Sequence, residues 1–313
     1  MIKQYKLAII GFGNVGQGLA KILCEKHSFL KDKFGVDIRI VAVCDLIKGS
    51  ITDPKGINPQ ELLNSLAHED ALLSLPAAVK GWTALDMIKH CDADILVELA
   101  YTDLTTGEPA LSHVKQALNK GMHVSMTNKG PVALHFPELR KIADENNVSL
   151  GIEGTVMSGT PSLHLGTEML AAAGINEIQG ILNGTTNYIL GEMENGADYD
   201  VALKQAQDLG YAEANPSGDV DGHDAAAKVV ILANLMMDMS ISLDDVECIG
   251  ISHLTAADIS QAAGLGKHWK LIGSIGYTAE GFKASVKPEM VSKTHPLAPI
   301  SGATNAITYT TEL

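Results

Sequence analysis

The sequence predicts an α/β protein in which a Rossmann-type parallel sheet domain is followed by a mixed α/β domain. Apolar runs of strand length recur through the first half of the chain and alternate with stretches of helical period. A glycine-rich turn follows the first of these runs, and after about residue 153 the alternation gives way to a different rhythm. This order of patterns is typical of a nucleotide-binding domain joined to a second domain.

The first half of the chain, residues 1–153, contains the parallel sheet. Its apolar runs are KLAIIGFG, IRIVAVCD, ADILVELA, MHVSMTNK and VSLGIEGT. A connecting stretch with Leu111, Val114, Ala117 and Leu118 has the spacing of an amphipathic helix. Buried parallel strands are apolar on both faces and need crossover connections, so the alternation predicts helices covering a parallel sheet.

The second half, residues 154–313, predicts a mixed domain. PSLHLGTEMLAAAG opens with a proline suited to a first helical turn, INEIQGILNG resembles a strand, and YDVALKQAQDLG resembles a helix closed by Gly210. HWKLIGSIGYTAEGFKASVKPEMV predicts two antiparallel strands joined at a Glu-Gly turn. We expect apolar sheet surface in these strands to need a partner, which predicts a homodimer or a larger homo-oligomer.

Charge and composition exclude several classes of partner. Asp and Glu total 37 against 23 Lys and Arg, a formal net charge of -14, and no basic cluster is present that would bind nucleic acid. Neither a membrane-spanning run nor a cleavable signal pattern is evident, so we expect a cytoplasmic protein that acts on a small molecule without a membrane partner. The four cysteines and the histidines lack the spacing of a zinc or disulfide framework.

The glycine-rich turn GFGNVG carries Gly11, Gly13 and Gly16, with Asn14 and Val15 between the last two. In a strand-turn-helix setting the first glycine makes the turn, the second lets the backbone approach a pyrophosphate, and the third packs the helix on the strand. The helix N-terminus adds positive potential. These residues predict a site for NAD or NADP, and the alternative is a plain tight turn.

Asp45 ends the second predicted strand, where a carboxylate would accept hydrogen bonds from the adenosine ribose and repel a 2′-phosphate. Lys48, three residues on, could instead meet such a phosphate. The choice between NAD and NADP therefore stays open, with a lean to NAD. The other interpretation is that Asp45 only caps a turn.

A cluster of charged residues lies directly before the apolar run VVILANLMM, in the segment DVDGHDAAAK. Asp224 and Lys228 are spaced i, i+4 on one face of a predicted helix, and Asp219 and Glu213 precede them. One interpretation is a surface ion pair, which would contribute only about 0.3 to 0.5 kcal/mol. The other is a site that uses these groups.

Two segments carry a resemblance to a known family. GILNGTTNYILGEM at 180–193 and AQDLGYAEANPSGDVDGHDAAAKVVILA at 206–233 resemble the signature of homoserine dehydrogenase. The similarity continues through TNKGPVA, EGTVMSGTPS and HPLAPISGATNAITYTT, and it spans nearly the whole chain. It implies reversible hydride transfer between a nicotinamide cofactor and the pair aspartate 4-semialdehyde and homoserine, with residues 154–313 as the catalytic and dimerisation domain.

The resemblance also implies residue roles. Proton transfer and catalysis fall to Lys228, Asp224 and Lys129, and we favour Lys228 as the proton donor and acceptor. Substrate contacts fall to Glu213, Asp219, Gly184 and Thr185, although a helix N-cap explains Thr185 about as well. Thr102 and Lys129 join the cofactor side. A second ammonium near Lys228 would help that lysine to release its proton.

A monovalent cation, sodium by preference, is a further implication of the resemblance. Its ligands would be Glu153, Val156, Ser158 and Thr160, through a carboxylate and backbone carbonyls. Hard oxygen ligands suit such an ion.

The chain departs from the family at its end. Members usually continue past the equivalent of Thr311 with a further strand and a glycine-rich segment, whereas this sequence stops at TYTTEL. We therefore expect weaker cofactor binding and closure, and no feedback through an added regulatory domain. The competing hypotheses are a dehydrogenase of another small amino or hydroxy acid, and a nucleotide-binding regulatory protein without catalysis.

Overall fold

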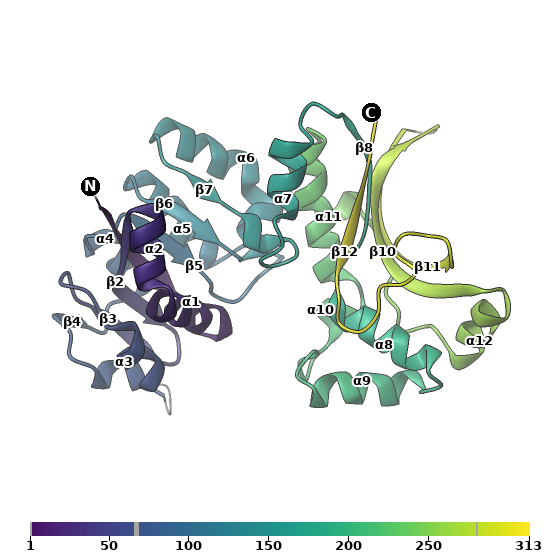
Figure 1. Ribbon diagram of the computed structural model, residues 1–313, viewed down its shortest axis with the longest axis horizontal. Coiled ribbons are helices and arrows are strands. Elements are labelled where there is room, and N and C mark those ends of the chain that lie inside the picture. The colour runs from purple at the N-terminus through teal and green to yellow at the C-terminus, as the bar shows by residue number, and fades with distance from the viewer. Residues whose placement is uncertain (1, 66–68, 280) are drawn as a thin grey trace. The chain divides into compact units, whose positions relative to one another are not determined.

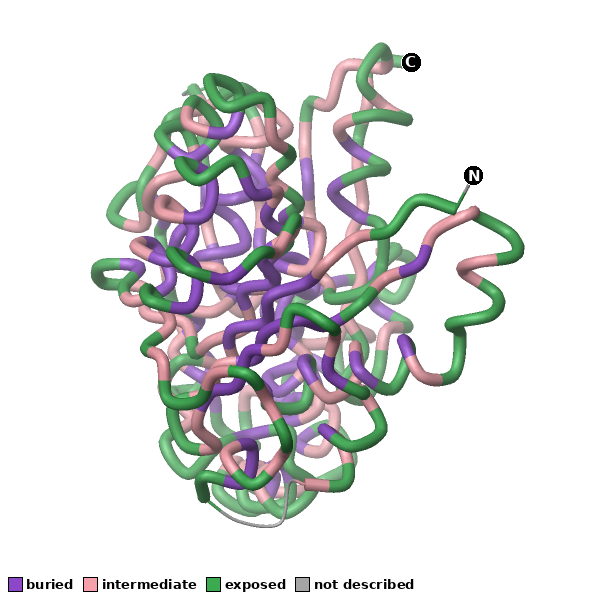
Figure 2. The backbone as a smooth tube through the Cα atoms, turned by 90° about the vertical axis from the view of Figure 1, so that its left-hand side faces the viewer, coloured by how far each residue is buried: buried purple, intermediate pink, exposed green. Residues whose placement is uncertain are grey.

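The computed structural model describes residues 2–65, 69–279 and 281–313. The chain divides into two compact units, Met1–Thr155 and Val156–Leu313, called the first and second unit below (Figure 1). Figure 2 shows that buried, intermediate and exposed stretches alternate along the backbone. Within the described residues, no helix combines the length and the apolar character that crossing a membrane would require.

The first unit contains a seven-stranded sheet whose order is β4-β3-β2-β1-β5-β6-β7. The strands are β1 (Lys3–Ile10), β2 (Val36–Asp45), β3 (Gly49–Thr52), β4 (Val79–Lys80), β5 (Ile95–Glu98), β6 (His123–Met126) and β7 (Leu150–Gly151). Strands β1, β2, β5, β6 and β7 pair in parallel, which confirms the predicted sheet. The antiparallel edge strands β3 and β4 were not predicted, because they are too short to show a period.

Helices connect and cover this sheet. They are α1 (Asn14–Glu25), α2 (His27–Phe34), α3 (Pro59–Asn64), α4 (Ala84–His90), α5 (Ala110–Asn119) and α6 (Lys129–Glu145). The predicted helical stripe lies on α5, where Leu111, Val114, Ala117 and Leu118 are all buried. Strand β2 lies on one side of β1 and β5 on the other, so the order of the strands reverses direction at β1. Ligands bind at the carboxyl edge of such a switch point.

The second unit contains a five-stranded sheet in the order β12-β8-β10-β11-β9. The strands are β8 (Ile175–Ile181), β9 (Glu247–Cys248), β10 (Lys267–Thr278), β11 (Gly281–Ser292) and β12 (Ala306–Thr311). The predicted antiparallel pair is confirmed in β10 and β11, which are joined from Lys267↔Ser292 to Thr278↔Gly281. Glu280, in the predicted Glu-Gly turn, lies outside the described residues.

The helices of the second unit are α7 (Ser162–His164), α8 (Gly184–Glu194), α9 (Tyr199–Asp208), α10 (Ser217–Val220), α11 (His223–Met236) and α12 (Ala256–Gly264), with a π-helical turn at Leu165–Met169. Helix α11 contains the predicted apolar run and packs against β10 and β11 (Figure 1). Its residues 225–233 are all buried. This helix carries the charged cluster at its N-terminal end.

The sheet face that points away from α11 carries polar side chains at one end and, at the other, the buried apolar residues Ile181, Ile272 and Val291. A Cβ on Gly273 would lie 3.0 Å from Val229 of α11, so the next residue of β10, Ser274, points to the opposite face. Ser274 pairs with Gln179 and with Ser285, and Gln179 pairs with Thr308. The apolar residues of β8 are thus divided between its two faces, with Ile178 on the side of α11 and Ile181 on the opposite side.

Candidate active site

The glycine-rich turn of the first unit has the geometry of a pyrophosphate cradle. Gly11 has a φ of +87°, and a Cβ there would lie 2.5 Å from the carbonyl oxygen of Leu99. A Cβ on Gly16 would lie 2.6 Å from the oxygen of Gly11, whereas one on Gly13 would meet nothing within 4 Å. The first and third glycines thus permit close packing, and the second leaves an open approach for a ligand.

Helix α1 presents its N-terminus at this open position. Gly13, Asn14 and Val15 are exposed, and no side chain caps the helix. The first N–H groups of a helix lack intrahelical partners and attract anions. The residues present therefore fit the diphosphate of a dinucleotide.

Asp45 holds the glycine-rich turn to the end of β2. Its Oδ2 accepts from the Phe12 amide at 2.7 Å, and its Oδ1 accepts from the amides of Ile47 and Lys48 at 3.0 Å each. Burial alone would raise the pKa of the Asp45 carboxyl, but these amides and the Lys48 ammonium outweigh it and lower that pKa below its ordinary value. Asp45 therefore remains anionic and caps the turn, and its Oδ2, which accepts only from Phe12 among the described residues, keeps a lone pair with which to accept from a ribose.

The loop that follows β5 and carries Thr102 is held by residues that the sequence analysis missed. Glu98 is fully buried; its Oε1 accepts from the amide of Ala100 at 2.8 Å, and its Oε2 lies 2.8 Å from Nδ1 of His113. Asn128 holds the same loop, because its Nδ2 donates to the carbonyl oxygens of Ala100 and Tyr101.

Asn128 also begins helix α6. Its Oδ1 accepts from the Gly130 amide at 3.1 Å, so its side chain caps the helix while its amide group holds the loop. Lys129, a predicted catalytic residue, is the first residue of that helix and is half-buried. The signal in the sequence was an asparagine directly between a strand and a helix, which is the position of an N-cap.

In the second unit, α11 places Asp224 and Lys228 one turn apart, and Lys228 reaches back to the end of β8. The Lys228 Nζ donates to Oδ2 of Asp224 at 2.8 Å and to the carbonyl oxygen of Leu182 at 2.5 Å. Only 9 % of Lys228 is exposed. The interpretation of this pair as a surface ion pair is therefore wrong, because its lysine is desolvated, and removing one partner of such a pair strands a charge.

Asn183 joins the two aspartates of the cluster and was not predicted from the sequence. Its Nδ2 donates to Oδ1 of Asp219 at 2.6 Å and to Oδ2 of Asp224 at 3.0 Å. Its Oδ1 accepts from the Thr186 amide at 2.9 Å as the N-cap of α8, so the amide group must face the carboxylates. Asn183, Asp219, Asp224 and Lys228 are called the carboxylate network below.

The Asp219 carboxyl of the carboxylate network is subject to opposing electrostatic influences. Burial raises the pKa of Asp219, and the neighbouring Asp224 carboxylate raises it further. The hydrogen bond from Asn183 and the Lys228 ammonium act in the opposite direction without cancelling the rise. The hydrogen bond from Asn183 therefore helps to keep Asp219 anionic.

Two further predicted residues, Gly184 and Thr185, lie beside this network. The Thr185 hydroxyl donates to the carbonyl oxygen of Tyr211 at 2.7 Å. The alternative that Thr185 caps the helix is wrong, because Asn183 occupies that position. A Cβ on Gly184 would lie 2.4 Å from the oxygen of Ala303, so the glycine allows this backbone to approach α8.

Glu213 lies outside the carboxylate network. It is exposed on the loop between α9 and α10, and only its backbone oxygen accepts a bond, from Gln207 at 3.1 Å. The predicted cation ligands are divided between the units, with Glu153 in the first and Val156, Ser158 and Thr160 in the second. The carbonyl oxygen of Val156 accepts from Oγ of Ser162 at 3.2 Å. No group of three His, Cys, Asp or Glu side chains suited to a metal occurs among the described residues.

Comparison with known families matches both units. Residues 11–153 match the homoserine dehydrogenase NAD binding domain, and residues 161–313 match the homoserine dehydrogenase family. The NAD(+)-dependent homoserine dehydrogenase of Pseudomonas canavaninivorans is 45 % identical over 311 residues, covering 99 % of this chain and 88 % of the relative. The homoserine dehydrogenase of Methanocaldococcus jannaschii is 37 % identical over 98 % of this chain and 90 % of its own.

Solved structures give the same result. The crystal structure of a putative homoserine dehydrogenase from Archaeoglobus fulgidus has a TM-score of 0.86 and 35 % identity, covering 98 % of this chain and 90 % of that one. A hyperthermophilic archaeal homoserine dehydrogenase mutant in complex with NADPH has a TM-score of 0.83 and 29 % identity, covering 98 % of this chain and 88 % of that one.

Proposed function

Because the chain belongs to the homoserine dehydrogenase family, we propose that its carboxylate network holds the substrate and moves the substrate's proton. The reaction is the reversible, NAD(P)-dependent transfer of hydride between homoserine and aspartate 4-semialdehyde. The proposed roles rest on one observation. The buried Lys228 donates a hydrogen bond to Asp224, and Asn183 donates hydrogen bonds to both Asp224 and Asp219.

The substrate makes chemical demands that these groups meet. Homoserine carries an α-ammonium, which needs carboxylate acceptors, and we assign Asp219, Asp224 and the exposed Glu213 to it. The reacting oxygen at C4 needs a proton donor in the reductive direction and an acceptor in the other. We assign that role to Lys228, with Lys129 as the second ammonium of the site.

The cofactor part of the proposal rests on the first unit. When bound, NAD or NADP accepts or supplies the hydride at the substrate carbon. Gly11, Gly13 and Gly16 with the N-terminal amides of Asn14 and Val15 would hold its diphosphate, and Thr102 would contribute from the loop after β5. One relative is NAD(+)-dependent by name and another was solved with NADPH, so both cofactors are candidates for this chain, and Asp45 favours NAD.

An absorbance assay at 340 nm tests the proposed function. Purified protein with homoserine and either cofactor should form NADH or NADPH, and aspartate 4-semialdehyde should consume it. Turnover of a different 2-hydroxy or amino acid in preference to homoserine would overturn the substrate assignment. Cofactor binding without any turnover would favour the regulatory alternative.

Replacing Asp45 separates its two roles. In Asp45→Asn the one remaining oxygen can accept from the Phe12 amide at the loss of the bonds from Ile47 and Lys48, and the charge that repels a 2′-phosphate is lost. We expect the kcat/KM for NADP, divided by that for NAD, to rise by about tenfold. A tenfold change corresponds to about 1.4 kcal/mol of free energy. In Asp45→Ala the bond to Phe12 is lost as well, so the KM for both cofactors should also rise. An unchanged ratio in both variants would show that Asp45 acts only on the turn.

We also propose a cytoplasmic location for the protein. A further proposal is a sodium ion held by the Glu153 carboxylate and the oxygens of Val156, Ser158 and Thr160. The backbone is left-handed at Met157 and Ser158, which turns the chain sharply within this segment. Sodium titration of an ion-free preparation, followed by thermal melting, tests the ion: a rise in Tm with sodium but not with choline is expected.

A homodimer or larger assembly built through the second unit is a further proposal. Strand β12 is an edge strand of the sheet, and a polar patch of Thr308, Gln179, Ser274 and Ser285 points away from α11. An edge strand and the sheet face beside it are surfaces that a second copy can cover. Light scattering should give at least twice the chain mass of 33.1 kDa. A monomer at micromolar concentration would contradict the proposal.

A further inference from the structure

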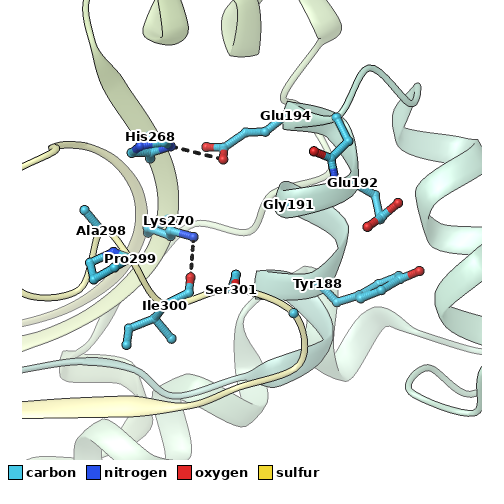
Figure 3. Close-up of a pocket in the computed structure, with 12 residues that line it drawn as sticks. Tyr188, Gly191, Glu192, Glu194, His268, Lys270, Ala298, Pro299, Ile300 and Ser301 are labelled. Atoms are coloured by element: carbon cyan, nitrogen blue, oxygen red, sulfur yellow. Dashed lines mark hydrogen bonds and ion pairs between the residues drawn. The ribbon is translucent and has the colours of Figure 1, made fainter.

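A second lysine of the second unit is buried without an acidic partner. Only 3 % of Lys270, on β10, is exposed. Its Nζ donates to the carbonyl oxygen of Ile300 at 2.7 Å and to Oδ1 of Asn187 at 3.1 Å (Figure 3). Both acceptors are neutral, and no carboxylate of the described residues forms an ion pair with Lys270. An ammonium carries three donors, so one remains available.

This arrangement is energetically incomplete. Transfer of an ammonium out of water is costly unless an anion compensates the charge. Burial lowers the pKa of Lys270. The Glu194 carboxylate acts in the opposite direction, but it lies too far from Lys270 to form an ion pair. Glu194 is itself paired with Nδ1 of His268 at 3.1 Å. The charge of Lys270 is therefore best compensated by an anion that the chain does not supply.

Lys270 lines a cavity of about 300 Å³ between α8 and the loop at residues 298–302 (Figure 3). On the loop side, the exposed Ser301 and Gly302 have backbone amides that bond to no other described residue. On the helix side, Glu192 lines the same cavity and forms no ion pair with any described basic residue. One wall thus offers a cation and N–H donors, and the other offers a carboxylate.

We infer that this cavity is a binding site for a small zwitterion with the chemistry of a free α-amino acid. The ligand carboxylate accepts from the third donor of Lys270 and from the amides of Ser301 and Gly302. The ligand ammonium faces Glu192. A volume of about 300 Å³ accommodates a molecule of this size, and it lies at the lower end of small-molecule sites.

The site is separate from the carboxylate network although both use α8. The network contacts the first turn of the helix through Asn183, whereas the cavity is lined by residues of its later turns, including Glu192. The loop links the two regions, because Asn187 Nδ2 donates to the oxygen of Gly302 at 2.9 Å, and Gly184 packs against Ala303. Since homoserine is itself a zwitterion, the test must distinguish the two sites.

Isothermal titration with glycine as the probe, on the full chain, tests the inference. Lys270→Met keeps the length and apolar stem of the side chain and removes its charge, and it should weaken glycine binding at least tenfold. Lys267→Met, on the same strand but outside the cavity lining, is the matched control and should bind as the parent does. Asp219→Asn, which alters the proposed substrate site, should retain binding in the cavity.

Further variants and probes keep the inference falsifiable. If Lys270→Met does not fold, as thermal melting would show, Glu192→Gln replaces it: this variant should weaken glycine binding while leaving acetate binding unchanged. Equal glycine binding by the parent and by the folded variant at Lys270 would overturn the inference. Loss of all glycine binding in Asp219→Asn would also overturn the inference, because it would place the glycine in the substrate site. The same holds if no saturable glycine binding occurs up to about 100 mM, a concentration at which a site with a Kd of about 1 mM is full.

Discussion

Lys228→Ala lowers kcat by roughly 10² to 10⁴, the usual contribution of a positioned acid or base. The Lys228 Nζ donates one hydrogen bond to the Asp224 carboxylate and one to the Leu182 carbonyl oxygen, and the lysine is buried. Its removal would take away the proposed proton source for the C4 oxygen. NAD(P) binding should remain close to that of the parent, because the proposed cofactor residues belong to the first unit.

The burial of Lys228 adds an effect on stability. Loss of the ammonium removes one donor from the Asp224 carboxylate, which keeps its hydrogen bond from Asn183, and one from the Leu182 carbonyl. We expect this loss to cost on the order of 1 to 3 kcal/mol of unfolding free energy. Lys228→Met is the matched variant, since it retains the apolar stem and lacks only the charge. Both variants should show the fall in kcat at a temperature where melting shows them folded. A kcat within about threefold of the parent would remove Lys228 from the mechanism and favour Lys129 in its place.

Asn183→Asp lowers kcat/KM by roughly 10² to 10³. The new carboxylate can still cap α8 through the Thr186 amide, but it replaces two donated hydrogen bonds by repulsion against Asp219 and Asp224. Hydrogen bonds to charged groups contribute about 1.5 to 3 kcal/mol each, so the loss of two accounts for this magnitude. Most of the effect should appear in the KM for homoserine, because the ammonium acceptors are displaced or protonated.

The pH profile distinguishes this role from a purely structural one. Burial already raises the pKa of Asp219, and a third carboxylate without the Asn183 donor would raise it further. Activity that requires anionic Asp219 is lost as the pH falls through that pKa, so the acidic limb of the kcat/KM profile should move to higher pH in the variant. Asn58→Asp is the control, since Asn58 also caps a helix, α3, but is exposed, and among the described residues its side chain bonds only to the Gln60 amide. An unshifted acidic limb in Asn183→Asp would contradict the positioning role.

The sequence predicted the features that depend on local spacing. The glycines of the nucleotide turn, the parallel strands and the i, i+4 pair Asp224 and Lys228 are each specified within a few residues. Asn183 was missed because its importance comes from Asp219 and Asp224, which are 36 and 41 residues away. The burial of Lys228 likewise depends on Leu182, 46 residues away, and no local pattern distinguishes a buried ion pair from an exposed one.

The errors in the fold have similar causes. Strands β3 and β4 contain four and two residues, too few for a period to be visible. Which face of β8 meets α11 could not be predicted, because an alternating strand has two faces and only the packed structure identifies the one that the helix covers. Thr185 was considered as the helix cap where Asn183 holds that position, an error of two residues at a helix start.

A crystal structure of the protein with homoserine and NADH, a pair that cannot react because both are reduced, tests the central claim most directly. The account predicts the homoserine hydroxyl oxygen within about 3.2 Å of the Lys228 Nζ, and its ammonium in contact with at least one carboxylate of Asp219, Asp224 or Glu213. Homoserine bound with its hydroxyl more than about 4 Å from Lys228, while that lysine still bonds only to Asp224 and Leu182, would contradict it.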